Sequence, residues 1–188
     1  MNRIERTLGV VVALCALLFA STGAHVPAYQ RTAWKHWIDV DRDCQNTRDE
    51  ALIAESLVPV TFADARGCRV ASGRWEDLYS GEIYTSPTEL DVDHMVPLQW
   101  AHQHGGWAWS PPIKAEFANE LEYPAHLVVV HRSLNRAKGA KGPEAWVPPD
   151  VARHCAYGRA WIAIVERWGL TVTWHEVKAM QRLVDRCE

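Results

Sequence analysis

The sequence predicts an α+β domain whose centre is formed by two strands and a short basic helix. The first strand is indicated by residues 90–97, where apolar and acidic residues alternate until Asp93-His94 and a proline end the pattern. The second is the unbroken apolar run 127–130, which is typical of a buried strand, and a basic helix is expected to begin at about Ser133. A long excursion separates the two strands.

Helical patterns flank this centre on both sides. Residues 47–50 form a capping-box pattern that begins a helix through Val58, and residues 60–70 and 75–84 are expected as strands. Apolar positions with helical spacing run from 151 to 168, and a second capping box at 173–176 begins a helix that includes Cys187. We therefore predict N-terminal helix and strand support and a C-terminal antiparallel helical hairpin.

The N-terminus has the features of a secretory signal peptide over residues 1–24. Basic residues precede an apolar run at 8–20, and small residues follow it at 21–24. The run is too short for a membrane span, although a retained anchor is the alternative. We expect a single secreted, extracellular or periplasmic domain over residues 25–188, with no membrane partner after cleavage and a monomeric state.

The charge of the expected mature chain is weakly negative overall and positive only locally. Removing residues 1–24 takes away two of the 20 basic residues and one of the 23 acidic ones, which leaves a net charge of −4. This excludes a general polyanion binder. The basic residues Arg132, Arg136, Lys138 and Lys141 lie close together without an intervening acid. A solvated helix face gives the same pattern, but the position beside the predicted site favours phosphate contact.

Four cysteines remain after the signal peptide, which suits an oxidising compartment: Cys44, Cys68, Cys155 and Cys187. In the predicted hairpin, Cys155 lies 13 residues before Trp168 and Cys187 lies 13 after Trp174. At ~1.5 Å per residue both are about 20 Å from the turn, so they are expected to pair and leave Cys44 with Cys68. A Cys/His zinc site is the alternative, which the wide cysteine spacing disfavours.

The residues at the strand end and on the basic helix suit single-metal phosphodiester chemistry. Asp93 and Asn135 supply hard oxygen ligands for one Mg²⁺ or Mn²⁺ ion, and the imidazole of His94, with an ordinary pKa near ~6.5, is the expected general base. Arg136 and Lys138 are expected to hold phosphates or to neutralise the transition state. Asp91 shares the face of Asp93, where it either tunes the site or faces solvent.

Residues from about 73 to 149 resemble the HNH, or ββα-metal, endonucleases. More narrowly, they resemble small secreted bacterial nucleases related to the C-terminal nuclease domain of GmrSD-type restriction enzymes. The matching stretches, in order, are 91–98, 117–119, 126–130, 135–143 and 146–148. The resemblance implies a ββα-metal (His-Me finger) core within residues 87–149. It assigns the same metal ligands, Asp93 and Asn135. We expect His94 and Lys138 to be the catalytic residues.

One residue departs from the family pattern. Where many members carry the middle Asn of the HNH motif, this chain has His126. In the family that Asn ties the excursion down through hydrogen bonds to backbone, and a neutral imidazole can also donate and accept. We therefore expect His126 to be a structural tether and not a metal ligand.

Other aromatic residues in the excursion permit two interpretations. Trp100, Trp107 and Trp109 could stack on bases, but core packing is the favoured reading. His102 and His104 are expected at the surface.

Together these patterns predict a secreted metal-dependent endonuclease of low sequence specificity, acting on DNA or, as a second candidate, RNA. Two alternatives stay open at this point. One is an exported, non-catalytic nucleic-acid-binding protein on the same scaffold, and the other is a metal-dependent phosphatase.

Overall fold

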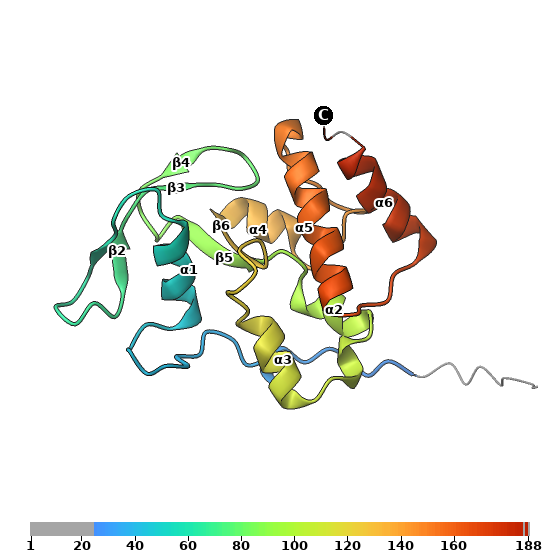
Figure 1. Ribbon diagram of the computed structural model, residues 1–188, viewed down its shortest axis with the longest axis horizontal. Helices are drawn as coiled ribbons and strands as arrows, with labels where there is room; N and C mark the ends of the chain where they lie inside the picture. Colours follow the sequence, from blue (N-terminus) through green and yellow to red (C-terminus); the bar gives the residue numbers. More distant parts are fainter. Residues whose placement is uncertain (1–24, 186, 188) are drawn as a thin grey trace, which may run out of the picture.

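The computed structural model describes residues 25–185 and 187, and over these residues the fold is α+β, as predicted (Figure 1). The expected signal peptide lies outside the described residues. The helices are η1 (Arg31–Ala33), α1 (Thr47–Glu55), α2 (Leu98–Gln103), η2 (Gly106–Ala108), α3 (Pro111–Ala118), α4 (Arg132–Lys138), η3 (Val151–Arg153), α5 (His154–Arg167) and α6 (Trp174–Val184). The strands are β1 (Thr61–Phe62), β2 (Val70–Ser72), β3 (Trp75–Glu76), β4 (Ile83–Tyr84), β5 (Leu90–His94) and β6 (Leu127–His131).

The centre of the fold is an antiparallel pair, β5–β6, followed directly by α4. In its register Val92 lies opposite Val129, Asp93 opposite Val128 and His94 opposite Leu127. Side chains alternate along a strand, so Asp93 and His94 face opposite sides of the pair, as the sequence indicated. Apolar clusters bury both faces: Val92 and Val129 pack in one cluster and Val128 in the other. Burial on both faces explains why β6 is apolar throughout.

The C-terminal helices form the predicted hairpin, in which α5 and α6 lie side by side (Figure 1). Thr173 and Glu176 cap α6 with the reciprocal hydrogen bonds of a capping box. Both predicted disulfides are present: Cys155–Cys187 with a Cα–Cα distance of 5.2 Å, and Cys44–Cys68 with 5.0 Å. The rise of a helix was therefore enough to choose the pairing.

The N-terminal half differs from its prediction in detail. The residue that caps α1 is Asn46, whose side chain accepts hydrogen bonds from the amides of Arg48 and Asp49. Thr47, the expected cap, instead donates its hydroxyl to the carbonyl of Ile38. The predicted long strands are two short hairpins, β1–β2 and β3–β4, because turns at 63–69 and 77–82 interrupt them.

The excursion between β5 and β6 packs into the core. Trp100 is 3% exposed and Trp109 is partly buried against the same cluster, so core packing is the better reading of these residues. The surface positions expected for two histidines are wrong. His102 is buried and donates to the Pro27 carbonyl, and His104 stacks on Trp100 and contacts Glu176 at 2.8 Å. No sequence pattern marks the long-range partners, Pro27 and Glu176.

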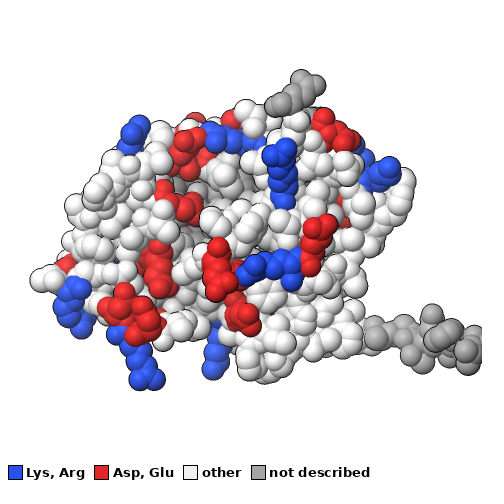
Figure 2. Space-filling view, in the orientation of Figure 1, with Lys and Arg blue, Asp and Glu red and all other residues white. Residues whose placement is uncertain are grey.

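The charges on the visible face are mixed. Acidic and basic side chains are interspersed across it, with several acidic groups together at its lower left (Figure 2). Within residues 25–185, no helix combines the length and apolarity that crossing a bilayer requires.

Candidate active site

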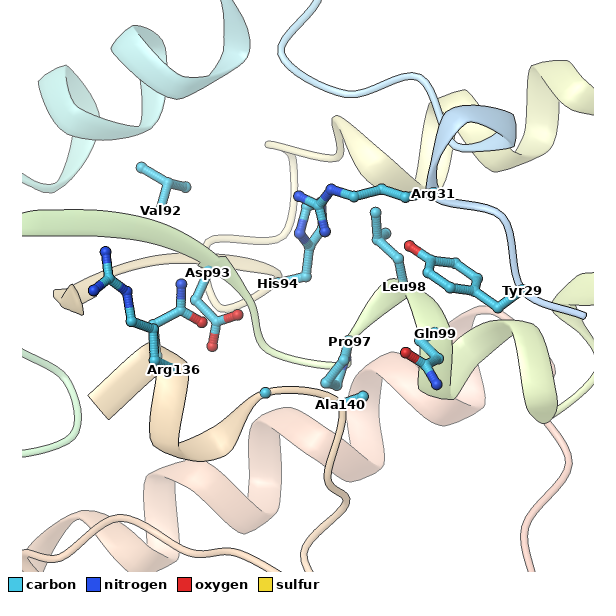
Figure 3. Close-up of a pocket in the computed structure, with 12 residues that line it drawn as sticks. Tyr29, Arg31, Val92, Asp93, His94, Pro97, Leu98, Gln99, Arg136 and Ala140 are labelled. Carbon is cyan, nitrogen blue, oxygen red and sulfur yellow. The ribbon is translucent and has the colours of Figure 1, made fainter. Parts of the chain in front are cut away.

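A cavity of about 310 Å³ opens where β5 ends and α4 passes it (Figure 3). It brings together the three residues on which the sequence argument rests, Asp93, His94 and Asn135. The rest of its wall consists of Tyr29, Arg31, Val92, Pro97, Leu98, Gln99, Arg136, Gly139 and Ala140. Strand β5, helices α2 and α4, the turn after α4 and the N-terminal segment therefore all contribute.

The imidazole of His94 has a fixed orientation. Its Nε2 lies 2.9 Å from the backbone carbonyl of Ala118 at the end of α3. A carbonyl only accepts, so Nε2 carries the hydrogen and Nδ1 keeps its lone pair in the neutral ring. Burial lowers the pKa of His94 to about 3, against the weaker, opposing effect of the Ala118 hydrogen bond. The expected pKa near ~6.5 is thus corrected downward, and the ring is unprotonated at neutral pH.

The carboxylate of Asp93 uses one oxygen within the protein. Oδ2 accepts from the Tyr79 hydroxyl at 2.8 Å and from the Lys138 ammonium at 2.7 Å. Within the described residues, no hydrogen bond engages Oδ1. Burial raises the pKa of the Asp93 carboxyl, and the Lys138 ammonium opposes this rise. Asp93 therefore has an anchored oxygen and a second oxygen available for a ligand.

Lys138 does not occupy the place that the sequence argument gave it. Its side chain is fully buried, it does not line the cavity, and its ammonium also donates to the backbone carbonyl of His94 at 2.8 Å. The reason is helical spacing: Lys138 follows Leu134 by one turn and shares its inward face, whereas Arg136 points outward. Lys138 therefore holds Asp93 and the end of β5 in place, and does not contact a substrate phosphate as expected.

Asn135 is oriented by Asp91. Its Nδ2 donates to Asp91 Oδ2 at 3.0 Å, so its amide hydrogens point toward β5 and its carbonyl oxygen is left for a ligand. Of the two roles considered for Asp91, the structure places its side chain on Asn135, where it can tune the site.

The donor set suits a divalent cation. The unengaged oxygen of Asp93 and the amide oxygen of Asn135 both belong to residues that line the cavity. Hard oxygen atoms of this kind are what Mg²⁺ prefers, and Mg²⁺ commonly takes one or two protein ligands and completes its shell with water and phosphate. The residues present therefore fit the expected ion.

His126 makes the type of contact that was predicted. Its side chain is 1% exposed, and Nε2 donates to the carbonyl of Phe117 at 2.7 Å. It does not line the cavity. The consecutive carbonyls of Phe117 and Ala118 thus accept hydrogen bonds from His126 and His94. Both histidines fix the end of α3 against the β5–β6 pair.

The next residue, Asn119, had no role in the sequence argument. Its side chain accepts from the Ile38 amide at 3.1 Å and donates to the Lys35 carbonyl at 2.8 Å. It thereby joins the N-terminal segment to the end of α3. The available signal was a polar residue directly after a helix end, but Ile38 and Lys35 lie more than 80 positions away.

The predicted basic cluster is only partly at the cavity. Arg136 lines it, whereas Arg132 and Lys141 do not, and Lys141 returns its ammonium to the Ala137 carbonyl at 2.7 Å. A second arginine in the wall, Arg31, comes from the N-terminal segment and was missed because that segment shows no catalytic pattern.

Comparisons with known proteins agree with this picture. The chain is 35% identical, over 160 residues, to an uncharacterized secreted protein of Arthroderma benhamiae, covering 85% of this chain and 76% of that protein. This relative and the two disulfides confirm that the protein is secreted. No solved structure matches. Residues 46–183 match the model of the C-terminal domain of GmrSD restriction endonucleases, so the chain belongs to this family.

Proposed function

We propose that the protein is a secreted endonuclease that hydrolyses phosphodiester bonds of DNA, and of RNA as a second candidate, with one divalent cation and low sequence specificity. The observation that supports this most is the convergence of Asp93, His94 and Asn135 on one cavity, each held by a partner through its other polar atom. Family membership agrees with nuclease activity. In this proposal β5, β6 and α4 form the ββα-metal core.

His94 acts as the general base. Because Nε2 is bound to Ala118, Nδ1 is the atom that accepts a proton from the attacking water. A ring with a pKa of about 3 is a weak base, but the negative charge of a phosphate bound beside it raises that pKa again. The hydrogen bond to Ala118 also prevents the ring from rotating away from the substrate.

Asp93 and Asn135 hold the cation. When bound, Mg²⁺ or Mn²⁺ neutralises the phosphate and stabilises the leaving 3′ oxygen. Lys138 and Tyr79 fix Asp93, and Asp91 fixes Asn135, so that both ligand oxygens are held before the substrate arrives. Exposed Arg136 on the cavity wall contacts a phosphate. The products are 5′-phosphate and 3′-hydroxyl ends by analogy with HNH enzymes.

Incubation with supercoiled plasmid tests the proposal. We expect nicking with Mg²⁺, none with chelator, and loss of nicking in His94→Ala with Mg²⁺ affinity retained in calorimetry. His175→Ala removes an exposed histidine away from the cavity and is the matched control. Asp93→Asn is preferable to Asp93→Ala because it keeps an acceptor for buried Lys138, and it should lose both metal binding and cleavage.

Three results would contradict this assignment. Plasmid binding without nicking in any divalent cation favours a non-catalytic binding protein. Hydrolysis of small phosphate monoesters while polymers survive favours a phosphatase. Equal loss of metal affinity in His94→Ala and Asp93→Asn makes His94 a ligand instead of the base.

A further inference from the structure

The segment that follows the expected signal peptide is fastened to the elements that form the active site. We call residues 25–37 the N-terminal strap. His102 of α2 donates to the Pro27 carbonyl at 2.8 Å, and Asn119 donates to the Lys35 carbonyl at 2.8 Å. Between these points Trp34 is 1% exposed and packs edge-on against Phe117 with ring centroids 5.7 Å apart. The strap is therefore held by a buried tryptophan and by both its ends.

Tyr29 and Arg31 lie between these attachments and line the cavity. In Figure 3 the Arg31 side chain extends from the strap toward His94, and the hydroxyl end of Tyr29 points toward Leu98 and Arg31. The Tyr29 hydroxyl is itself buried, so Arg31 is the exposed polar group of the two. The strap thus brings the guanidinium of Arg31 to the side of the cavity that α4 does not reach.

The charge of Arg31 is not used within the described residues. Its side chain forms a hydrogen bond to the neutral acceptor Nε2 of His36 at 3.2 Å, and no carboxylate of residues 25–185 forms an ion pair with it. Lys138, by contrast, is fully committed to Asp93 and the His94 carbonyl. Among the described residues, the cationic side chains that line the cavity are therefore Arg31 and Arg136.

These arginines lie on different sides of the reacting centre. Arg31 is on the side of His94, and Arg136, from α4, is beyond Asp93 (Figure 3). A guanidinium presents a planar fork of donors that matches phosphate oxygens. Two such groups on either side of one cleavage site suit a ligand with several phosphates along a chain, and not a single phosphate.

We propose that Arg31 contacts substrate, binding a backbone phosphate next to the scissile one on the His94 side. The inference rests on the proposed nuclease function and adds a binding subsite: the polynucleotide extends past the cavity over the N-terminal strap. Small diesters would not reach Arg31.

Binding and cleavage of two substrates by Arg31→Gln test the assignment. The probes are a fluorescent oligonucleotide duplex, titrated in EDTA over a series of salt concentrations, and bis(p-nitrophenyl) phosphate, hydrolysed with Mg²⁺ or Mn²⁺. We expect duplex affinity to fall on the order of tenfold. The salt slope should drop by about one, since one phosphate contact is lost. Hydrolysis of the small diester should stay within about twofold of wild type. Arg31→Lys keeps the charge but not the planar fork of donors, so its duplex affinity should lie between those of wild type and Arg31→Gln.

Arg182→Gln is the matched control, since Arg182 is exposed on α6 and does not line the cavity. If Arg31→Gln and Arg182→Gln bind the duplex with the same affinity and salt slope, the proposal is overturned. An equal loss on duplex and small diester also overturns it, because Arg31 would then act on the scissile phosphate or on His94. Failure of the nuclease proposal looks different: wild type cleaves neither substrate, while the duplex titration still reports on Arg31.

Discussion

The variant Lys138→Met tests whether Lys138 supports Asp93, as the structure indicates, or contacts a substrate phosphate, as the sequence predicted. The substitution keeps most of the side-chain length but removes the ammonium that donates to Asp93 Oδ2 at 2.7 Å and to the His94 carbonyl at 2.8 Å. Lys138 is 0% exposed and Asp93 is 7% exposed. Removing one partner of a buried ion pair leaves the other charge uncompensated and typically costs about 3–5 kcal/mol of unfolding free energy. We expect a loss of this size without metal.

Urea unfolding in EDTA measures that loss, and Lys141→Met is the control. Lys141 lies beyond the end of the same helix, but its ammonium is exposed, so its removal should change the unfolding free energy by no more than about 0.5 kcal/mol. Adding Mg²⁺ should then stabilise Lys138→Met more than wild type, because a cation on Asp93 supplies the missing positive charge. At a free concentration of 100 Kd a bound ligand contributes about 2.7 kcal/mol.

Two results would refute this reasoning. Equal unfolding free energies for Lys138→Met and Lys141→Met in EDTA would show that the Asp93–Lys138 pair does not stabilise the fold. If Lys138→Met instead has wild-type stability and normal metal affinity but no cleavage activity, Lys138 contacts the substrate, as the sequence predicted.

Two further predictions concern Glu55, which bonds to β6, and His126, which directly precedes this strand. Glu55 accepts from the Val129 amide at 2.9 Å, and burial raises the pKa of its carboxyl from 4.5 to about 7. The folded state therefore binds this proton more tightly, and stability should fall by up to about 3 kcal/mol as the pH rises from 4.5 to 7. Glu55→Gln should remove that fall in urea unfolding at pH 5 and pH 8, and an unchanged pH dependence would contradict the assignment. His126→Ala should lose about 1–3 kcal/mol in thermal unfolding together with turnover. His126→Gln, whose amide nitrogen reaches the position of Nε2 as Asn does not, should retain both; equal damage by Gln and Ala would exclude the tether.

The parts of the fold that the sequence predicted correctly are those set by local pattern. The apolar run of β6 and the alternation in β5 fixed the central pair, and its register puts Asp93 and His94 on opposite faces. The disulfide Cys155–Cys187 followed from helix rise and an antiparallel turn. In the strand, the positions follow from the alternation of side chains along it. In the helical hairpin, they follow from the equal distance of the two cysteines from the turn.

The errors arose where a partner distant in sequence decides the outcome. Thr47 looked like a helix cap, but its hydroxyl is engaged by Ile38 and Asn119, so Asn46 caps α1 instead. Lys138 belonged to a basic run that suggests a solvated or phosphate-binding face, yet the inward side of α4 meets a buried carboxylate. Composition alone does not reveal such partners.

The end of α3 emerges as the element on which the precision of the active site depends. The Phe117 carbonyl accepts from His126 Nε2, the Ala118 carbonyl accepts from His94 Nε2, and the Asn119 side chain donates to the strap at the Lys35 carbonyl. Three consecutive residues therefore set the tautomer of the base, the return of the excursion and the path of the segment that carries Arg31. These contacts tie the His94 ring and the strap to α3, whereas the Asp93 carboxylate is held by Lys138 and Tyr79. The ring of the base and the strap thus depend on α3, and Lys138 links the two halves of the proposed site because it donates to both Asp93 and the His94 backbone carbonyl. Substitutions at Asn119 should accordingly impair cleavage while leaving metal affinity intact.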